Sequence, residues 1–431
     1  MAENIREIVL DTLLEMERNK VYSHQLIKAV LDKYDYLDVQ EKRFMKRLTE
    51  GCIERKIELD YCLNHFSTVP VSKMKPLIRC LMRMGVYQIL FMDSVPDSAA
   101  CNEAVKLANK RKFANLKGFV NGVLRKIAAN KEQLPMPQRK DEEQYLSVKY
   151  SVPEWLVRLW LETYDADTTE KILEAALEIH PVSVRFRTNL TEKQREEYIQ
   201  KWQKKGVKVQ ENSLLPYMYT LENVDGVTAL DGFEEGVFTV QDVSSALSVE
   251  AAGIQPTDFC IDVCAAPGGK TMLAAEKAAR VLSRDVTEYK TTYIRENCDR
   301  MQLSDKVQVQ VWDATVKDEA LKEAADVVLM DVPCSGLGVL GKKRDIKYNV
   351  SPESMESLNE LQKSIVDHSW EYVKKGGTLL YSTCTIHRKE NEDMCRWICE
   401  NYPFELEEER QILPGLTQAD GFYYARLRRK E

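Results

Sequence analysis

The chain has 431 residues, of which 44% are hydrophobic and 30% charged, and its formal net charge is −7. This length and composition predict a globular protein of two or three domains, and no stretch reaches the roughly 18 apolar residues that a membrane span needs. The N-terminal segment mixes apolar and charged residues at helical spacing, unlike a signal peptide, so we expect a cytoplasmic protein without membrane contact. Eleven cysteines without any C-x-x-C pair argue against both a disulfide framework and a zinc site, so we expect no metal.

The first third of the chain is basic and has helical periodicity. Residues 1–140 hold 25 Lys and Arg against 17 Asp and Glu, and eight basic residues occur without an acid between Ala104 and Lys131. Because a solvated helix face usually intersperses acids, this run favours contact with phosphates. Apolar residues recur at spacings of three and four, which predicts an all-helical domain over 1–135.

Two further regions follow a polar stretch that contains prolines. Region 145–235 predicts a small α+β module, because 182–189 and 207–211 alternate as strands do and 190–206 has the pattern of an amphipathic helix. Region 236–431 starts with the apolar stretch GVFTVQDVSSAL and alternates strands with helices to its end. That order is typical of a doubly wound α/β domain.

Four successive strands of this third region end in polar residues, which predicts a ligand site at one sheet edge. The strands after the first end at Asp285, Asp313 and Asp331. A P-loop is excluded, because it requires a glycine where Cys264 stands. An acid at the tip of the second strand is the position that holds a ribose diol, so a nucleoside-type ligand is expected. The first strand is followed by a tight turn of Cys264, Ala265, Ala266, Pro267, Gly268 and Gly269.

Two cysteines stand just past the ends of two apolar strands. Cys334 lies in VVLMDVPCSGLG and Cys384 lies in LLYSTCTIHRKENED. Two inert buried thiols would leave unexplained why both follow strands that end at the predicted ligand edge. The arrangement therefore favours a site in which both thiols act on one substrate.

Three motifs, DVCAAPGGKT, MDVPCSGLG and YSTCTIHRKENE, resemble the signatures of RNA 5-methylcytosine methyltransferases that use S-adenosylmethionine. Residues 102–127 resemble the core of a NusB-like RNA-binding domain. With the C-terminal QILPGLTQADGFYYARLRRK, the motif order is similar to that of the RsmB (Sun or Fmu) family, which methylates a cytosine of small-subunit ribosomal RNA. The resemblance covers nearly the whole chain and implies a NusB-like domain, a small α+β RNA-binding module and a Rossmann-like methyltransferase domain. The sequence departs from the family pattern at 338–349, where Gly341 and Arg344 interrupt that pattern.

The resemblance also implies roles for the site residues. Cys384 is expected to attack C6 of the cytosine, because C5 cannot take up a methyl group until a thiolate has added to the ring. Cys334 is expected to assist product release; in DNA cytosine methyltransferases the Pro-Cys residue attacks instead, so the reverse assignment stays open. Asp331 is expected to contact the cytosine edge, with Lys270 orienting that carboxylate or meeting the cofactor.

S-adenosylmethionine is expected to bind the glycine turn, Lys270 and the strand-end aspartates. The expected substrate is a single-stranded ribosomal RNA loop with a flipped cytosine, and a monomer is expected. One alternative is a non-catalytic RNA-binding or antitermination factor, which would be expected to have lost a cysteine or a strand-end aspartate. Another is a cytosine-C5 methyltransferase that acts on DNA or transfer RNA, and the NusB-like segment favours ribosomal RNA over it by resemblance.

Overall fold

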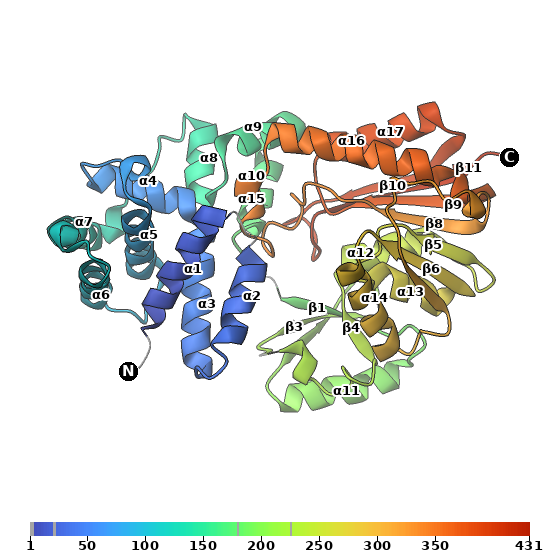
Figure 1. The fold of residues 1–431 in the computed structure, drawn as a ribbon, viewed down its shortest axis with the longest axis horizontal. Helices are drawn as coiled ribbons and strands as arrows, with labels where there is room; N and C mark the ends of the chain where they lie inside the picture. The colour runs from blue at the N-terminus through green and yellow to red at the C-terminus, as the bar shows by residue number, and fades with distance from the viewer. Residues whose placement is uncertain (1–3, 20–22, 179–180, 225) are drawn as a thin grey trace. The chain divides into compact units, whose positions relative to one another are not determined.

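The protein divides into two compact units in a computed structural model that describes residues 4–19, 23–178, 181–224 and 226–431. One unit comprises Met1–Glu178 together with Leu340–Asn349, and the other comprises Ile179–Val339 together with Val350–Glu431 (Figure 1). The chain therefore enters the first unit a second time, far along the sequence. The three domain ranges drawn from the sequence stay predictions.

The first unit is helical, as the periodicity predicted, and α5 forms its centre. Most residues of α5 are buried. A Cβ atom at Gly85 would lie 2.7 Å from the Leu124 side chain, so α5 and α7 approach each other closely at this point. The helices are α1 (Ile5–Asn19), α2 (Ser23–Lys33), α3 (Val39–Glu54), α4 (Lys56–Phe66), α5 (Pro76–Phe91), α6 (Asp97–Lys110), α7 (Lys117–Ala129), α8 (Glu142–Tyr150), α9 (Glu154–Thr163) and α10 (Ala166–Ala175).

Residues 340–349, which include α15 (Ile346–Asn349), are held in this unit by hydrogen bonds and ion pairs. Arg344 Nε donates to Glu54 Oε1 at 2.7 Å, and its Nη1 pairs with Glu50. The hydroxyl of Tyr348 lies 3.0 Å from the carbonyl oxygen of Ser151. The segment that departs from the family pattern thus has a structural role in the first unit.

A four-stranded antiparallel sheet opens the second unit. Its strands are β1 (Val182–Phe186), β2 (Lys208–Glu211), β3 (Met218–Glu222) and β4 (Phe238–Val240), in the order β2-β3-β1-β4. On α11 (Glu192–Lys204), Trp202 stacks on Phe186 with ring centroids 5.2 Å apart. The strand at 238–240 was expected to open the third region, but it pairs with β1. Alternation of apolar residues does not reveal which sheet a strand joins.

The second sheet is Rossmann-like, as predicted, and has seven strands in the order β10-β11-β9-β8-β5-β6-β7. Five are parallel and the last two along the chain, β10 and β11, form an antiparallel pair at one edge. The strands are β5 (Phe259–Asp262), β6 (Arg280–Asp285), β7 (Val307–Val311), β8 (Ala325–Asp331), β9 (Val373–Thr383), β10 (Phe404–Ile412) and β11 (Phe422–Arg429).

Helices cover both faces of this sheet and bury two apolar clusters (Figure 1). One face packs on α12 (Val243–Ala251), α13 (Gly269–Lys277) and α14 (Glu288–Arg300). The other packs on α16 (Pro352–Ser369) and α17 (Glu392–Asn401). In the described part of the chain, no helix has the length and apolar character needed to cross a membrane.

Candidate active site

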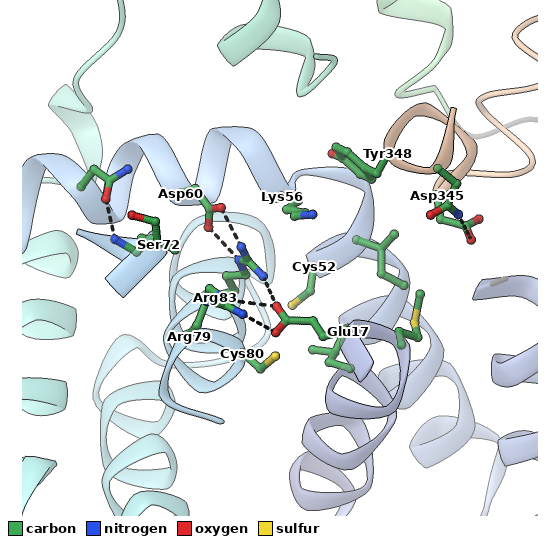
Figure 2. Close-up of a pocket in the computed structure, with 16 residues that line it drawn as sticks. Glu17, Cys52, Lys56, Asp60, Ser72, Arg79, Cys80, Arg83, Asp345 and Tyr348 are labelled. Carbon is green, nitrogen blue, oxygen red and sulfur yellow. Dashed lines mark hydrogen bonds and ion pairs between the residues drawn. The ribbon is translucent and has the colours of Figure 1, made fainter. Parts of the chain in front are cut away.

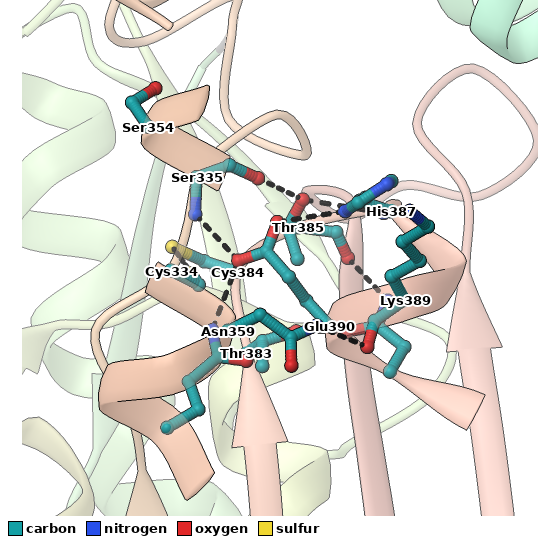
Figure 3. Close-up of polar contacts among 12 residues, drawn as sticks. Cys334, Ser335, Ser354, Asn359, Thr383, Cys384, Thr385, His387, Lys389 and Glu390 are labelled. Carbon is teal, nitrogen blue, oxygen red and sulfur yellow. Dashed lines mark hydrogen bonds and ion pairs between the residues drawn. The ribbon is translucent and has the colours of Figure 1, made fainter. Parts of the chain in front are cut away.

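The two cysteines predicted to work together lie side by side. Cys334 follows β8 and Cys384 follows β9, and these strands are parallel neighbours whose ends align, with Asp331 opposite Ser382. The carboxyl ends of parallel strands meet at one edge of the sheet. The two Sγ atoms are 3.3 Å apart and part-buried. Figure 3 shows the two side chains next to each other.

Cys334 is kept protonated by its surroundings. The neighbouring Cys384 thiol raises the pKa of Cys334 well above its usual value, burial raises it further, and the Glu390 carboxylate adds to the effect. A thiol in a low-dielectric site beside a second sulfur and a carboxylate resists ionisation, because each of them disfavours a new negative charge. Cys334 can therefore donate a proton toward the sulfur of Cys384 at neutral pH.

Asp331 is fixed in orientation by two donors beside the thiols. Lys270 Nζ lies 2.7 Å from Asp331 Oδ2, and the hydroxyl of Ser382 donates to Oδ1 at 2.8 Å. The Lys270 ammonium also lies 4.9 Å from the ring centroid of Phe422. Lys270 itself is buried, whereas about a third of the Asp331 side chain, 31%, stays exposed. A partly exposed carboxylate with a fixed orientation can receive hydrogen bonds from a ligand.

Asp285, the residue expected to hold the ribose, is tied to the glycine turn. Its Oδ2 accepts the Ala266 N–H at 2.9 Å and its Oδ1 accepts the Val286 N–H at 2.8 Å. Lys290 Nζ lies 3.0 Å from the same Oδ1. The turn closes with the Gly268 N–H donating to the carbonyl of Ala265, and Gly268 has a φ of +106°, which favours glycine.

Asp313 and Cys264 are placed differently from the other predicted ligand residues. β7 ends at Val311, so Asp313 lies beyond the strand on an exposed turn. Its Oδ1 accepts both the N–H and the hydroxyl of Thr315, at 2.9 and 2.7 Å, and these bonds lower the pKa of Asp313. Burial raises the pKa of the Cys264 thiol, which packs against the apolar cluster under α16 and α17.

Sequence reasoning missed the residues that join the two cysteine loops. The hydroxyls of Ser335 and Thr385, each the residue after a cysteine, lie 2.7 Å apart. The N–H of Gly338 donates to the carbonyl of Cys384 at 3.1 Å, and a Cβ at Gly338 would lie 2.0 Å from the Gly421 carbonyl oxygen. The glycines in SGLG were the available signal, because close backbone approach requires them.

A buried carboxylate, Asp262, was also missed at the end of β5. It is fully buried and accepts the Thr271 hydroxyl at 2.7 Å, while its other oxygen has no partner among the described residues. Burial raises the pKa of Asp262 to about 7, although the Thr271 hydrogen bond opposes this. Within the described ranges, no group of three or more His, Cys, Asp or Glu side chains is placed to hold a metal ion.

A cavity of about 820 Å³ lies in the first unit, and its lining contains none of the predicted site residues (Figure 2). Its charged side chains pair with one another: Arg83 contacts both Asp60 and Glu17 at 2.7 Å, and Arg79 contacts Glu17. Tyr348 of the 340–349 segment forms part of its wall. The mutual pairing leaves the wall close to neutral.

Comparison with known proteins identifies the family. Residues 251–428 match the description "16S rRNA methyltransferase RsmB/F", residues 3–129 match the NusB family, and residues 152–228 match an RsmF/B-like ferredoxin-like domain. A Bacillus subtilis protein named "Probable ribosomal RNA small subunit methyltransferase B" is 33% identical, covering 99% of both chains. The chain belongs to this methyltransferase B family. A relative from Escherichia coli O7:K1 named "Ribosomal RNA small subunit methyltransferase B" is 31% identical over 91% of each chain.

Solved structures agree with the fold of the family. The crystal structure of PH0851 has a TM-score of 0.80 and 24% identity, covering the whole of both chains. NSun6 from Pyrococcus horikoshii has a TM-score of 0.57 and 19% identity, and it covers 65% of this chain and 98% of its own. The family and the fold class predicted from the motifs are thereby confirmed.

Proposed function

We propose that the protein transfers a methyl group from S-adenosylmethionine to C5 of a cytosine in 16S ribosomal RNA, by way of a covalent bond between Cys384 and C6. Membership of a family of ribosomal RNA methyltransferases supports the substrate class. The observation that carries the mechanism is the 3.3 Å separation of the Cys334 and Cys384 sulfurs at the ends of two adjacent strands.

The chemistry requires one thiol to attack and a second group to assist release. The Cys384 sulfur, once deprotonated, forms a bond to C6, and the electron pair of the C5–C6 double bond makes C5 nucleophilic. S-adenosylmethionine, when bound, supplies the electrophilic methyl group that C5 takes up. A base then removes the proton from C5, the C5–H electron pair restores the double bond, and the C6–S bond breaks with its electrons returning to Cys384.

The assignment of the two thiols rests on family resemblance, which makes Cys384 the attacking residue and Cys334 the residue that assists release. The 3.3 Å separation of the sulfurs lets the S–H of Cys334 donate to the departing sulfur of Cys384. The thiolate is the reactive form of a cysteine, so the attacking thiol must first lose its proton. The same separation fits the reverse arrangement, which variants of the two cysteines distinguish.

Asp331 and Lys270 are proposed to hold the base. The Asp331 carboxylate is oriented by Lys270 and Ser382 within three residues of Cys334. A fixed carboxylate can accept a hydrogen bond from the exocyclic amino group of the cytosine and so orient the ring for attack. Because the edge and both thiols must be reached together, the cytosine has to leave its stack, which favours a single-stranded loop.

The residues at the glycine turn fit the chemistry of S-adenosylmethionine. The ionised Asp285 carboxylate has about four lone-pair positions, and three donors contact it, so a ribose hydroxyl can still be accepted. The first N–H groups of α13, which starts at Gly269, have no partner within the helix and can meet an anionic group. Cys264, Ala265, Ala266 and Pro267 complete the proposed cofactor turn.

The proposal is tested with purified protein and fragments of 16S ribosomal RNA. Methylation should appear at C5 of one cytosine, read by bisulfite sequencing or by nucleoside mass spectrometry. The same RNA carrying 5-fluorocytosine at that position has no proton to lose from C5, so it should remain covalently bound to the protein. Methylation of a different atom or of another base, or no retained RNA, would contradict the proposal.

A further inference from the structure

Two adjacent buried residues, Glu390 and Asn391, lie at the junction of the two cysteine loops. They follow Cys384 by six and seven positions, where a short 3₁₀ turn (Arg388–Glu390) ends and α17 starts. Both side chains are fully buried although both are polar. Burial of a carboxylate or an amide is costly unless hydrogen bonds compensate for it, so their partners indicate what they hold in place.

Asn391 holds the backbone on both sides of Cys384. Its Oδ1 accepts the hydroxyl proton of Thr383 at 2.6 Å, and its Nδ2 donates to the carbonyl of Thr385 at 3.1 Å. The same Nδ2 donates to Gln411 Oε1 at 2.7 Å. One side chain therefore fixes the residues immediately before and after Cys384.

Glu390 holds the other loop. Its Oε2 accepts the N–H of Ser335, the residue after Cys334, at 2.9 Å, and the amide of Gln362 at 3.0 Å (Figure 3). The Gln362 amide also donates to the carbonyl that precedes Cys334, at 2.9 Å. The other oxygen of Glu390 lies 3.2 Å from His387 Nδ1. The carboxylate therefore fixes the loop of Cys334, directly on one side and through Gln362 on the other.

We propose that Glu390 and Asn391 are positioning residues with separate tasks, Asn391 setting Cys384 for attack on C6 and Glu390 setting Cys334 for release. This rests on the proposed covalent function. Small displacements of a reacting group lower its rate strongly, because reaction requires a near-attack geometry. Since the two residues are adjacent in the chain, one turn sets the positions of both sulfurs.

The test measures two rates separately. Protein and RNA are mixed for a single turnover, quenched in denaturant and separated by electrophoresis, so that covalent protein–RNA complex is followed as it forms and as it decays. Asn391→Ala should slow formation about tenfold or more and leave decay unchanged. Glu390→Ala, which removes the acceptor of both the Ser335 N–H and the Gln362 amide, should leave formation near the wild-type rate, slow decay about tenfold and accumulate the complex.

A second variant for each residue keeps the test valid if the Asn391 or the Glu390 variant does not fold. Thr383→Val removes the hydroxyl donor to Asn391 and should reproduce slow formation. Gln362→Leu removes the donor shared by Glu390 and the Cys334 loop and should reproduce slow decay. Asn359→Ala is the matched control, because this buried amide bonds the same turn at the Lys389 carbonyl and, among the described residues, has no hydrogen bond to either cysteine loop.

The outcomes separate this inference from the proposed function. Equal slowing of both rates in the Glu390 and Asn391 variants, or rates matching those of Asn359→Ala, would overturn the division of tasks. If wild-type protein forms no complex even with 5-fluorocytosine RNA, the covalent function itself fails. If the wild type forms the complex but the variants change neither its formation rate nor its decay rate, only the positioning roles are overturned.

Discussion

At the scale of single residues, the site depends on carboxylates whose environments differ. Asp285 and Asp331 each accept hydrogen bonds from fixed donors, but Asp285 is buried whereas Asp331 keeps 31% of its side chain exposed, and Asp262 is fully enclosed. Asp313 binds its own turn through Thr315. These four acids therefore differ in exposure and in hydrogen-bond partners, a distinction that sequence position does not reveal.

Asp285→Ala should weaken the binding of S-adenosylmethionine. Loss of a hydrogen bond to a charged group costs roughly 1.5–3 kcal/mol, which corresponds to about ten- to a hundred-fold in affinity. Isothermal titration calorimetry measures the change, with the exposed Asp305→Ala as control. Wild-type affinity in Asp285→Ala would place the ribose elsewhere.

Asp262 should make stability depend on pH. Its pKa rises from 3.8 to about 7 on burial, so the stability it contributes is present below pH 4 and is lost as the pH rises through 7. Asp262→Asn keeps an acceptor for Thr271 and removes this dependence. The free energy of unfolding of Asp262→Asn minus that of the wild type, both measured by denaturant titration, should therefore increase between pH 5 and 8, by several kcal/mol at most. A difference that stays constant with pH would show that Asp262 ionises normally.

At the scale of elements, the basic run on α6 and α7 is partly neutralised. Lys110 pairs with Glu7, Lys131 with Asp97, and Lys106 with Glu103. Lys112, Lys117, Arg125 and Lys126 are exposed, and no ion pair to an acid is found for them among the described residues. The phosphate affinity expected from the sequence should therefore concentrate on these four cations.

Lys112→Ala combined with Lys117→Ala should weaken RNA binding and reduce its dependence on salt. Each lost phosphate contact lowers the slope of log K against log salt concentration by about 0.7–0.9. Filter binding at several salt concentrations gives the slope. Lys106→Ala is the control, since its ammonium is already paired with Glu103, and it should change the slope less. An unchanged slope in the double variant would assign these lysines to another partner.

The sequence predicted those elements whose local pattern specifies them. Helical periodicity and strand-end motifs placed α5, β8 and β9 correctly, because apolar spacing is a local property. The antiparallel pairing of β11 with β9 and the pairing of β4 with β1 depend on contacts between distant residues. Glu390 and Asn391 were missed for a similar reason, since a charged stretch such as HRKENED also fits an exposed helix start.

At the scale of the whole molecule, the chain passes from the second unit into the first and back at residues 340–349. Ile346 and Lys347 are buried there, and burial lowers the pKa of Lys347 to about 7. Removal of residues 1–178 would therefore strip this segment of its partners as well as remove the basic helices. Point substitutions separate the two effects.

Arg344→Ala should destabilise the first unit. The change leaves the carboxylates of Glu50 and Glu54 without the guanidinium that pairs with both, at a cost of about 1–3 kcal/mol. Thermal unfolding measures the loss, and the exposed Lys343→Ala serves as control. Affinity for S-adenosylmethionine should stay at the wild-type value. Unchanged stability would show that the Arg344 ion pairs contribute nothing measurable to holding the segment.

The central claim is that Cys384 attacks the base and Cys334 assists its release. The direct measurement is denaturing electrophoresis of each cysteine variant after incubation with substrate RNA and S-adenosylmethionine. Cys384→Ala should give neither covalent complex nor methylated product, whereas Cys334→Ala should attack, fail to release, and accumulate a retarded protein–RNA band. A band formed by Cys384→Ala and absent from Cys334→Ala would reverse the two roles, and no band with either variant would contradict covalent catalysis.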